Sequence, residues 1–181
     1  MPLPASADVL AARRARFVQR LDAYTPAQRA WRPAPGAWSP ADVAEHVYRT
    51  ERGTLTALRR ALAAGDARPA LGPLRPDKLA ALEAFFADGT RRTTMPPAAA
   101  AFVAPQGLGW PETRAGWTET EARWGELHPP AVLDGVGLVP HPVAGPMDAD
   151  TALRFLAAHT RHHLFQLDRI EASDGFPTAT G

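Results

Sequence analysis

The chain has 181 residues, 45% of them hydrophobic and 22% charged, with a formal net charge of +1 at pH 7. This length suits a single domain over residues 1–181, and the composition excludes global disorder. The near-neutral charge gives no basic field for nucleic acid, and the lack of cysteine excludes disulfides, thiolate zinc sites and a cysteine nucleophile.

Apolar side chains recur at three- and four-residue steps from Ser6 to about Tyr24, which predicts a first amphipathic helix. The stretch "TPAQRAWRPAPGAWSP" follows as a linker with four prolines. Its Thr25-Pro26 pair can start a short helical turn, because proline fits the first turn of a helix.

A second helix has a clear start signal, because Ser39 can cap it and Pro40 suits its first position. We expect it to run to about Ala64 and to end at Gly65. Its predicted inner stripe consists of Val43, His46, Val47, Thr50, Thr54 and Leu58. Its predicted outer face carries Glu45, Arg49, Arg52, Arg59 and Arg60.

Residues 65–111 are less regular and are predicted to be an insertion or crossover within the domain. We expect a short helix from Asp77 to Asp88, and the later stretch "TTMPPAAAAFVAPQGLGWP" is interpreted as a connection rich in proline, alanine and glycine. So long a connection is uncommon inside a compact domain, and the two roles left open for it are a lid over a site and a dimer contact.

A third helix is expected from Pro111 or Glu112 to about Leu127. The next stretch, "HPPAVLDGVGLVPHPVAGP", has too many prolines and glycines to predict a pair of strands. A last helix is expected from 148–151 to about Ser173, ending at Gly175. Four amphipathic helices joined by irregular connections predict an all-α four-helix bundle.

The N-terminal stretch has no apolar core of a signal peptide, and no run approaches eighteen apolar residues. We therefore expect a cytoplasmic protein that contacts neither membrane nor nucleic acid.

Three of the six histidines combine into a candidate metal site. His159 and His163 are four residues apart, so both rings leave one face of the last helix. His46 lies on the inner stripe of the second helix, and bundle cores bring such stripes together. Three neutral imidazoles from two helices would leave coordination positions open for water or substrate. The alternative is that three core histidines pack separately.

The remaining candidates receive structural interpretations. His162 points away from the predicted inner face and is expected to be partly exposed or structural. His128 and His141 lie at or beyond helix ends, and a loop role is favoured for His141. A solvated ion pair is expected for Glu51. Core packing is favoured over pocket lining for the tryptophans Trp31, Trp38, Trp110, Trp117 and Trp124.

Two stretches, "WRPAPGAWSPADVAEHV" and "HPVAGPMDADTALRFLAAHTRHHLFQL", resemble the DinB/YfiT-like metal-dependent bundle proteins over about residues 6–172. The resemblance implies an up-down-down-up four-helix bundle with a long crossover, often dimeric. It also implies His46, His159 and His163 as metal ligands, with Gln166 nearby for a supporting bond. Other members often carry an aromatic residue or arginine where this chain has His162, which leaves a register ambiguity that the helical periodicity resolves in favour of His163.

The family includes thiol-dependent S-transferases and hydrolase-like enzymes, and many members have no assigned activity. We therefore expect a divalent-metal-dependent enzyme for thiol S-transfer or hydrolysis of a small molecule, using zinc, nickel, iron or manganese to activate a water or a thiol. Because the chain lacks cysteine, the thiol would come from a small-molecule cosubstrate. The alternatives are a non-catalytic protein that binds a small ligand and a stress-associated structural homodimer.

Overall fold

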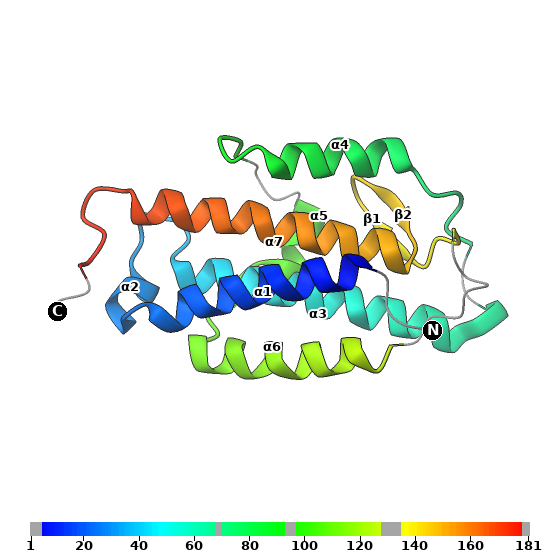
Figure 1. The fold of residues 1–181 in the computed structure, drawn as a ribbon, viewed down its shortest axis with the longest axis horizontal. Coiled ribbons are helices and arrows are strands. Elements are labelled where there is room, and N and C mark those ends of the chain that lie inside the picture. Colours follow the sequence, from blue (N-terminus) through cyan, green and yellow to red (C-terminus); the bar gives the residue numbers. More distant parts are fainter. Residues whose placement is uncertain (1–4, 68–69, 93–96, 128–134, 179–181) are drawn as a thin grey trace.

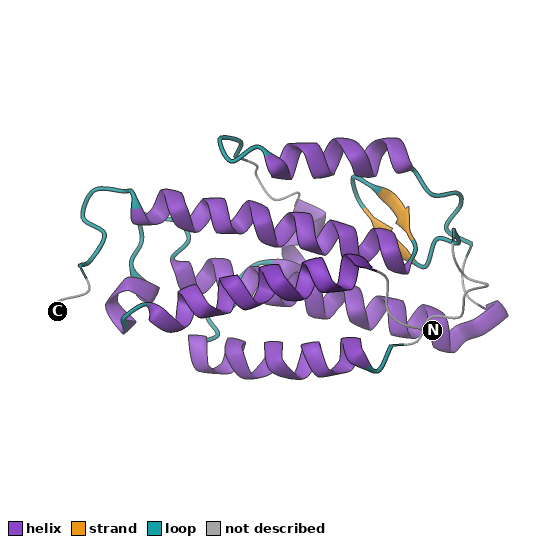
Figure 2. Cartoon of the chain, viewed as in Figure 1, coloured by secondary structure: helices purple, strands orange, loops and turns teal. Residues whose placement is uncertain are grey.

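The computed structural model describes residues 5–67, 70–92, 97–127 and 135–178, which are mostly helical, as the all-α prediction requires (Figures 1 and 2). The α-helices are α1 (Ala5–Ala23), α2 (Pro26–Ala30), α3 (Pro40–Ala64), α4 (Pro76–Ala87), α5 (Pro97–Val103), α6 (Trp110–Gly125) and α7 (Ala149–Glu171). A 3₁₀ turn η1 (Gly65–Ala67) follows α3, and a hairpin of β1 (Val139–His141) and β2 (Gly145–Met147) precedes α7. Across the described part of the chain, no helix combines the length and apolar character that a membrane span requires.

The start of α3 follows the predicted capping signal. The Asp42 N–H donates to the Ser39 hydroxyl at 3.2 Å, and the Ser39 N–H donates to the Asp42 carboxylate at 2.7 Å. This reciprocal pair satisfies amides that the first helical turn leaves free. Gly65 ends the helix with a φ of 52°, a left-handed value that glycine adopts without steric cost. Both ends of α3 therefore confirm the sequence prediction.

Four long helices lie lengthwise side by side, with α1 and α7 running in one direction and α3 and α6 in the other (Figure 1). The helix α7 packs against α1, α3 and α4, and α3 also packs against α6. The short helix α5 rests on α3. Since α7 is covered by three other helices, side chains on most of its faces are buried, including both of its predicted metal ligands.

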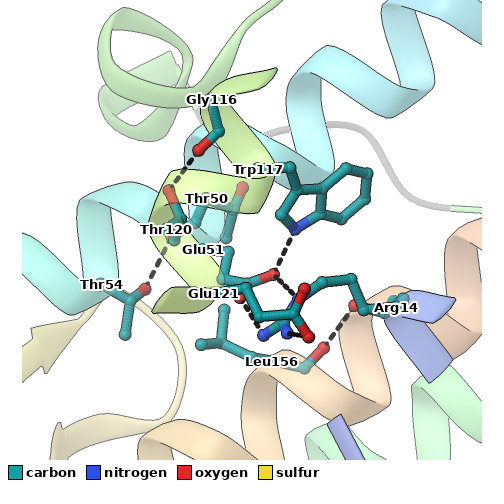
Figure 3. Close-up of polar contacts among 10 residues, drawn as sticks. Arg14, Thr50, Glu51, Thr54, Gly116, Trp117, Thr120, Glu121 and Leu156 are labelled. Carbon is teal, nitrogen blue, oxygen red and sulfur yellow. Dashed lines mark hydrogen bonds and ion pairs between the residues drawn. The ribbon is translucent and has the colours of Figure 1, made fainter. Parts of the chain in front are cut away.

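The core contains a buried ion pair that the sequence analysis placed in solvent. Arg14 on α1 pairs with Glu51 on α3, and the indole N–H of Trp117 on α6 donates to the same carboxylate at 2.7 Å (Figure 3). The side chains of Arg14 and Glu51 are 6% and 1% exposed. The solvated ion pair expected for Glu51 is wrong, because Arg14 interrupts the apolar stripe of α1 and supplies a charge inside the core.

Two elements of the connections were missed by the sequence analysis. The β1–β2 ribbon pairs Val139 with Met147 and Pro140 with Pro146 in antiparallel register. Proline is tolerated there because each strand of a two-stranded ribbon is an edge that needs few donors. The helix α5 has the sequence "PAAAAFV", whose alanines favour helix without forming an amphipathic stripe. Because α5 lacks an apolar period, hydrophobic periodicity does not predict it, and the segment is interpreted as a connection.

Candidate metal centre

The structure brings the rings of His46, His159 and His163 together between α3 and α7. The Nε2 atom of His159 lies 3.1 Å from the Nε2 of His46 and 3.1 Å from the Nε2 of His163. One ligand atom from each ring lies within 4.8 Å of the others, and all three residues are 6–7% exposed. The two inner stripes predicted for these helices thus meet at one point, although His46 and His159 are 113 residues apart.

Hydrogen bonds on the outer side of two rings fix which nitrogen carries the proton. The Nδ1 of His46 lies 2.9 Å from the Val103 carbonyl oxygen, and the Nδ1 of His163 lies 2.7 Å from Gln166 Oε1. Both partners are acceptors, so each Nδ1 must be the N–H that donates. In the neutral rings of His46 and His163, the Nε2 lone pair then faces the centre of the cluster.

His159 lies between these two lone pairs. Its own Nε2 faces both of them, and one N–H can donate well to only one acceptor at a time. Its Nδ1 is buried and has no hydrogen-bond partner among the residues that the structure describes. Protein hydrogen bonds therefore leave this cluster with more nitrogen lone pairs than donors, which is the arrangement that suits a bound cation.

Burial keeps the three rings neutral. It lowers the pKa of His46 to about 4, against a smaller opposing effect of the Val103 carbonyl. Burial also lowers the pKa of His159 and of His163 well below the ordinary value, and the neighbouring imidazoles act in the same direction. Only a neutral imidazole binds a metal, so near pH 7 all three side chains are in the state that ligation requires.

Aromatic side chains surround the three rings. The ring centroid of Trp38 lies 5.0 Å from that of His46, and those of Phe86 and Phe155 lie 5.7 and 5.5 Å from that of His159. Trp38 lies just before α3, Phe86 belongs to α4 and Phe155 to α7. An apolar surround of this kind limits water access and strengthens the electrostatic interactions inside it.

His162 is buried among aromatic side chains, so of its two expected roles partial exposure is wrong and the structural role is the one observed. It is 3% exposed, and its ring lies 5.1 Å from that of Phe86 and 6.0 Å from that of Phe85, measured between centroids. The helix α4 covers this face of α7 (Figure 1), and the periodicity of α7 alone carries no information about that contact. The candidate ligand group in the described residues contains His163 and not His162.

The remaining two histidines, His141 and His128, are not among the candidate ligands. The Nδ1 of His141 accepts the backbone N–H groups of Val143 and Ala144 at 3.2 and 3.0 Å, so it has the expected loop role. Its ring centroid also lies 4.4 Å from that of Phe155. His128 lies outside the described residues.

Sequence reasoning missed Glu45, which it placed on the outer face of α3. Glu45 is 0% exposed, because residues 106–108 fold over it and donate three backbone N–H groups to its carboxylate. The periodicity of α3 carries no signal for this contact. Only the position of α5 brings the following loop back across that face of α3.

The donor set fits a divalent transition metal. Zinc–imidazole bonds are about 2.0–2.1 Å long, so two nitrogens 3.1 Å apart can both bind one ion. Nitrogen donors without a thiolate suit zinc, nickel and iron better than magnesium or calcium. Among the described residues, His46, His159 and His163 therefore form the group that could hold a metal.

The amino-acid sequence was also compared with protein-family models. The model of the DinB superfamily matches residues 10–167. The chain belongs to the DinB superfamily. No curated protein and no solved structure matches the chain. The matched region of this DinB-superfamily protein includes His46, His159, His163 and Gln166.

Proposed function

We propose that this protein binds one divalent transition-metal ion through His46, His159 and His163 and is a metal-dependent enzyme acting on a small molecule, by thiol S-transfer or by hydrolysis. The observation that carries the proposal is the convergence of three Nε2 atoms. In His46 and His163, the bonds of Nδ1 to Val103 and Gln166 leave Nε2 unprotonated, with its lone pair facing the cluster. A bound divalent ion supplies a nucleophile at neutral pH by lowering the pKa of a coordinated water or thiol.

The chain's own residues would position the centre and keep it dry. The Val103 carbonyl and the Gln166 amide orient the rings of His46 and His163, and outer bonds of this kind strengthen metal ligands. Trp38, Phe86 and Phe155 exclude water from the rings that they contact. Because the chain has no cysteine, the S-transfer reaction would require a small-molecule thiol as cosubstrate.

We also propose that the chain has the helix arrangement that the family resemblance implies. The opposed directions of α1 and α7 against α3 and α6 support an up-down-down-up four-helix bundle (Figure 1), with residues 65–111 as the crossover inside one domain. A cytoplasmic homodimer is the assembly that we propose for it. Sedimentation equilibrium of the untagged protein tests the dimer directly, and a monomer mass at micromolar concentration would contradict it.

The metal site is tested by metal content. We would purify the untagged wild type, His159→Ala and His162→Ala and measure bound metals by inductively coupled plasma mass spectrometry. We expect about one equivalent of a transition metal in wild type, as three ligands for one ion require, and its loss in His159→Ala. His162→Ala is the matched control, because it removes a buried histidine of α7 outside the ligand group. Metal-free wild type, even after soaking with zinc, nickel or manganese, would contradict the proposal.

A non-catalytic ligand-binding protein is the second candidate, and the buried carboxylates of α3 favour it. Glu45 is engaged by three backbone amides, and Glu51 by Arg14 and Trp117. Neither side chain is therefore free to act as a general base. Turnover assays with and without added thiol on the metal-loaded protein separate the two, since a binding protein gives no turnover in either.

A further inference from the structure

The carboxylate of Glu45 receives three consecutive backbone amides. Its Oε1 accepts the N–H of Gln106 at 2.7 Å, and its Oε2 accepts those of Gly107 and Leu108, each at 2.9 Å. Gly107 has a φ of 88°, which turns the backbone so that these amides converge. One fully buried side chain of α3 thus holds the loop that follows α5.

The same segment provides the acceptor that orients His46. The Val103 carbonyl at the end of α5 accepts the Nδ1–H of His46 at 2.9 Å, and His46 directly follows Glu45 in α3. Arg49, one turn further along α3, donates to the Phe102 carbonyl at 3.0 Å. Three side chains of α3 therefore bind residues 102–108. Glu45 accepts three of these hydrogen bonds, and His46 and Arg49 donate one each.

We propose that Glu45 is a positioning residue of the metal centre. By holding residues 102–108 on α3, its carboxylate keeps the Val103 carbonyl within hydrogen-bond distance of His46 and so fixes the ring with Nε2 toward His159 and His163. This inference rests on the proposed metal site. According to this inference, Glu45, which is not a ligand, controls the tautomer and the orientation of the ligand His46.

The chemistry at this position requires an acceptor without donors. An ionised carboxylate offers two oxygens that only accept, whereas an amide would turn an NH₂ group toward at least one of the three backbone N–H groups. We call the three hydrogen bonds from residues 106–108 to Glu45 the Glu45 clamp. Glu45→Gln preserves the size of the side chain and loses at least one of these hydrogen bonds. The Glu45 side chain is fully buried, whereas residues 106–108 are exposed, so the donor–donor contact is relieved by movement of the loop, and the Val103 carbonyl moves with it.

The first test is zinc affinity, measured by competition with a chromophoric chelator for wild type, Glu45→Gln and Glu51→Gln. Losing an outer partner of a ligand typically weakens metal binding by about 10- to 100-fold, and we expect a loss in this range for Glu45→Gln. Glu51→Gln removes the other fully buried carboxylate of α3, which faces Arg14 and Trp117, and should retain wild-type affinity. Unchanged affinity in Glu45→Gln, or an equal loss in both variants, would overturn the inference.

A second variant perturbs the clamp from the loop side and leaves α3 intact. A Cβ added at Gly107 would meet no atom within 4 Å, so Gly107→Ala strains only the left-handed backbone. Gly175→Ala is the matched control, because Gly175 has a φ of 82° and equally open surroundings beyond the end of α7. We expect weaker zinc binding and an altered visible spectrum of the cobalt-substituted protein for Gly107→Ala only. Equal results for the two variants would count against the clamp.

A third readout does not depend on bound metal. In ¹⁵N NMR spectra of the metal-free protein, His46 of wild type should carry its proton on Nδ1, and Glu45→Gln should show a shift toward the Nε2-protonated form. The same tautomer in both proteins would overturn the role of Glu45. If wild type binds no zinc, the proposed function fails, while this tautomer measurement still decides whether Glu45 positions His46.

Discussion

At the residue level, the buried ion pair between Arg14 and Glu51 is the feature of the core that depends most on both of its members being present. Arg14 contacts two carboxylates, the buried Glu51 and the more exposed Glu121, whose Oε1 lies 2.9 Å from its Nη1 (Figure 3). The pair joins α1 to α3, and Trp117 adds α6 through its indole N–H. Two opposite charges in a low-dielectric core stabilise each other only while both are present.

Replacing one partner should therefore cost more than replacing both. We expect Arg14→Met to lower the free energy of unfolding by about 3–5 kcal/mol, because it leaves the Glu51 carboxylate buried without its cation. The double variant Arg14→Met with Glu51→Gln should recover at least about 1 kcal/mol, since a neutral amide oxygen still accepts from Trp117. Urea unfolding monitored by tryptophan fluorescence measures both, and a double variant less stable than Arg14→Met would show that the pair is not the source of the loss.

The candidate ligands could be predicted from the sequence, whereas the residues that support them could not. His46, His159 and His163 lie on helical stripes, and periodicity within a helix identifies such positions. Glu45 and Glu51 are buried by partners from other helices and loops, so their own helix predicts exposure. Gln166 was expected from the family resemblance and not from periodicity, and its bond to His163 spans only three residues.

At the level of elements, one aromatic ring lies between the turn of the β1–β2 hairpin and the three-histidine cluster. His141 accepts two turn amides through Nδ1 and packs on Phe155, whose ring centroid lies 5.5 Å from that of His159. Burial lowers the pKa of His141 to about 4. Protonation would convert its Nδ1 from an acceptor to a donor and break both turn hydrogen bonds.

The hairpin should therefore weaken in acid. The folded pKa of His141 lies below the unfolded value of about 6.5, so its contribution to stability is complete above pH 6.5 and is lost as pH falls toward 4. Each pKa unit corresponds to about 1.4 kcal/mol, which limits this loss to roughly 3 kcal/mol at pH 4. Melting temperatures from pH 7.5 to 4 for metal-free wild type and His141→Asn measure it.

Asparagine is the informative replacement, because its side-chain oxygen can accept the same turn amides and does not titrate. The melting temperature of His141→Asn should fall less steeply between pH 6.5 and 4 than that of wild type. Parallel curves would show that groups other than His141 cause the acid sensitivity.

Helix and strand boundaries could be predicted where residues nearby in the sequence set them, and not where distant residues do. The capping box of α3 and its terminal glycine are local signals, and both ends were predicted correctly. The hairpin and α5 depend on packing against α7 and α3, respectively, and their sequences contain prolines or alanines without an amphipathic period. Their existence was therefore missed, although the irregular region containing each was located.

At the level of the whole molecule, the candidate centre connects the two helices that organise the packing. The helix α7 contacts α1, α3 and α4, and α3 contacts α5 and α6 as well. Three neutral imidazoles at the α3–α7 contact gain little from one another without a cation, because the His159 N–H can donate to only one of the two inward-facing lone pairs of His46 and His163. An ion bound there would join α3 to α7 only in the folded state, so binding and folding are thermodynamically linked.

Adding metal should therefore raise the melting temperature. Free zinc at 100 times its Kd contributes about 2.7 kcal/mol, which for a chain of this size corresponds to a rise of about 5–10 °C. Calorimetry of chelator-treated protein with and without zinc measures the rise, and added chelator should reverse it. His159→Ala should show no zinc-dependent rise, whereas His162→Ala should retain most of it despite a lower starting temperature. If neither zinc nor chelator changes the melting temperature of wild type, the three histidines are packed core side chains, and the fold is stable without any ion between α3 and α7.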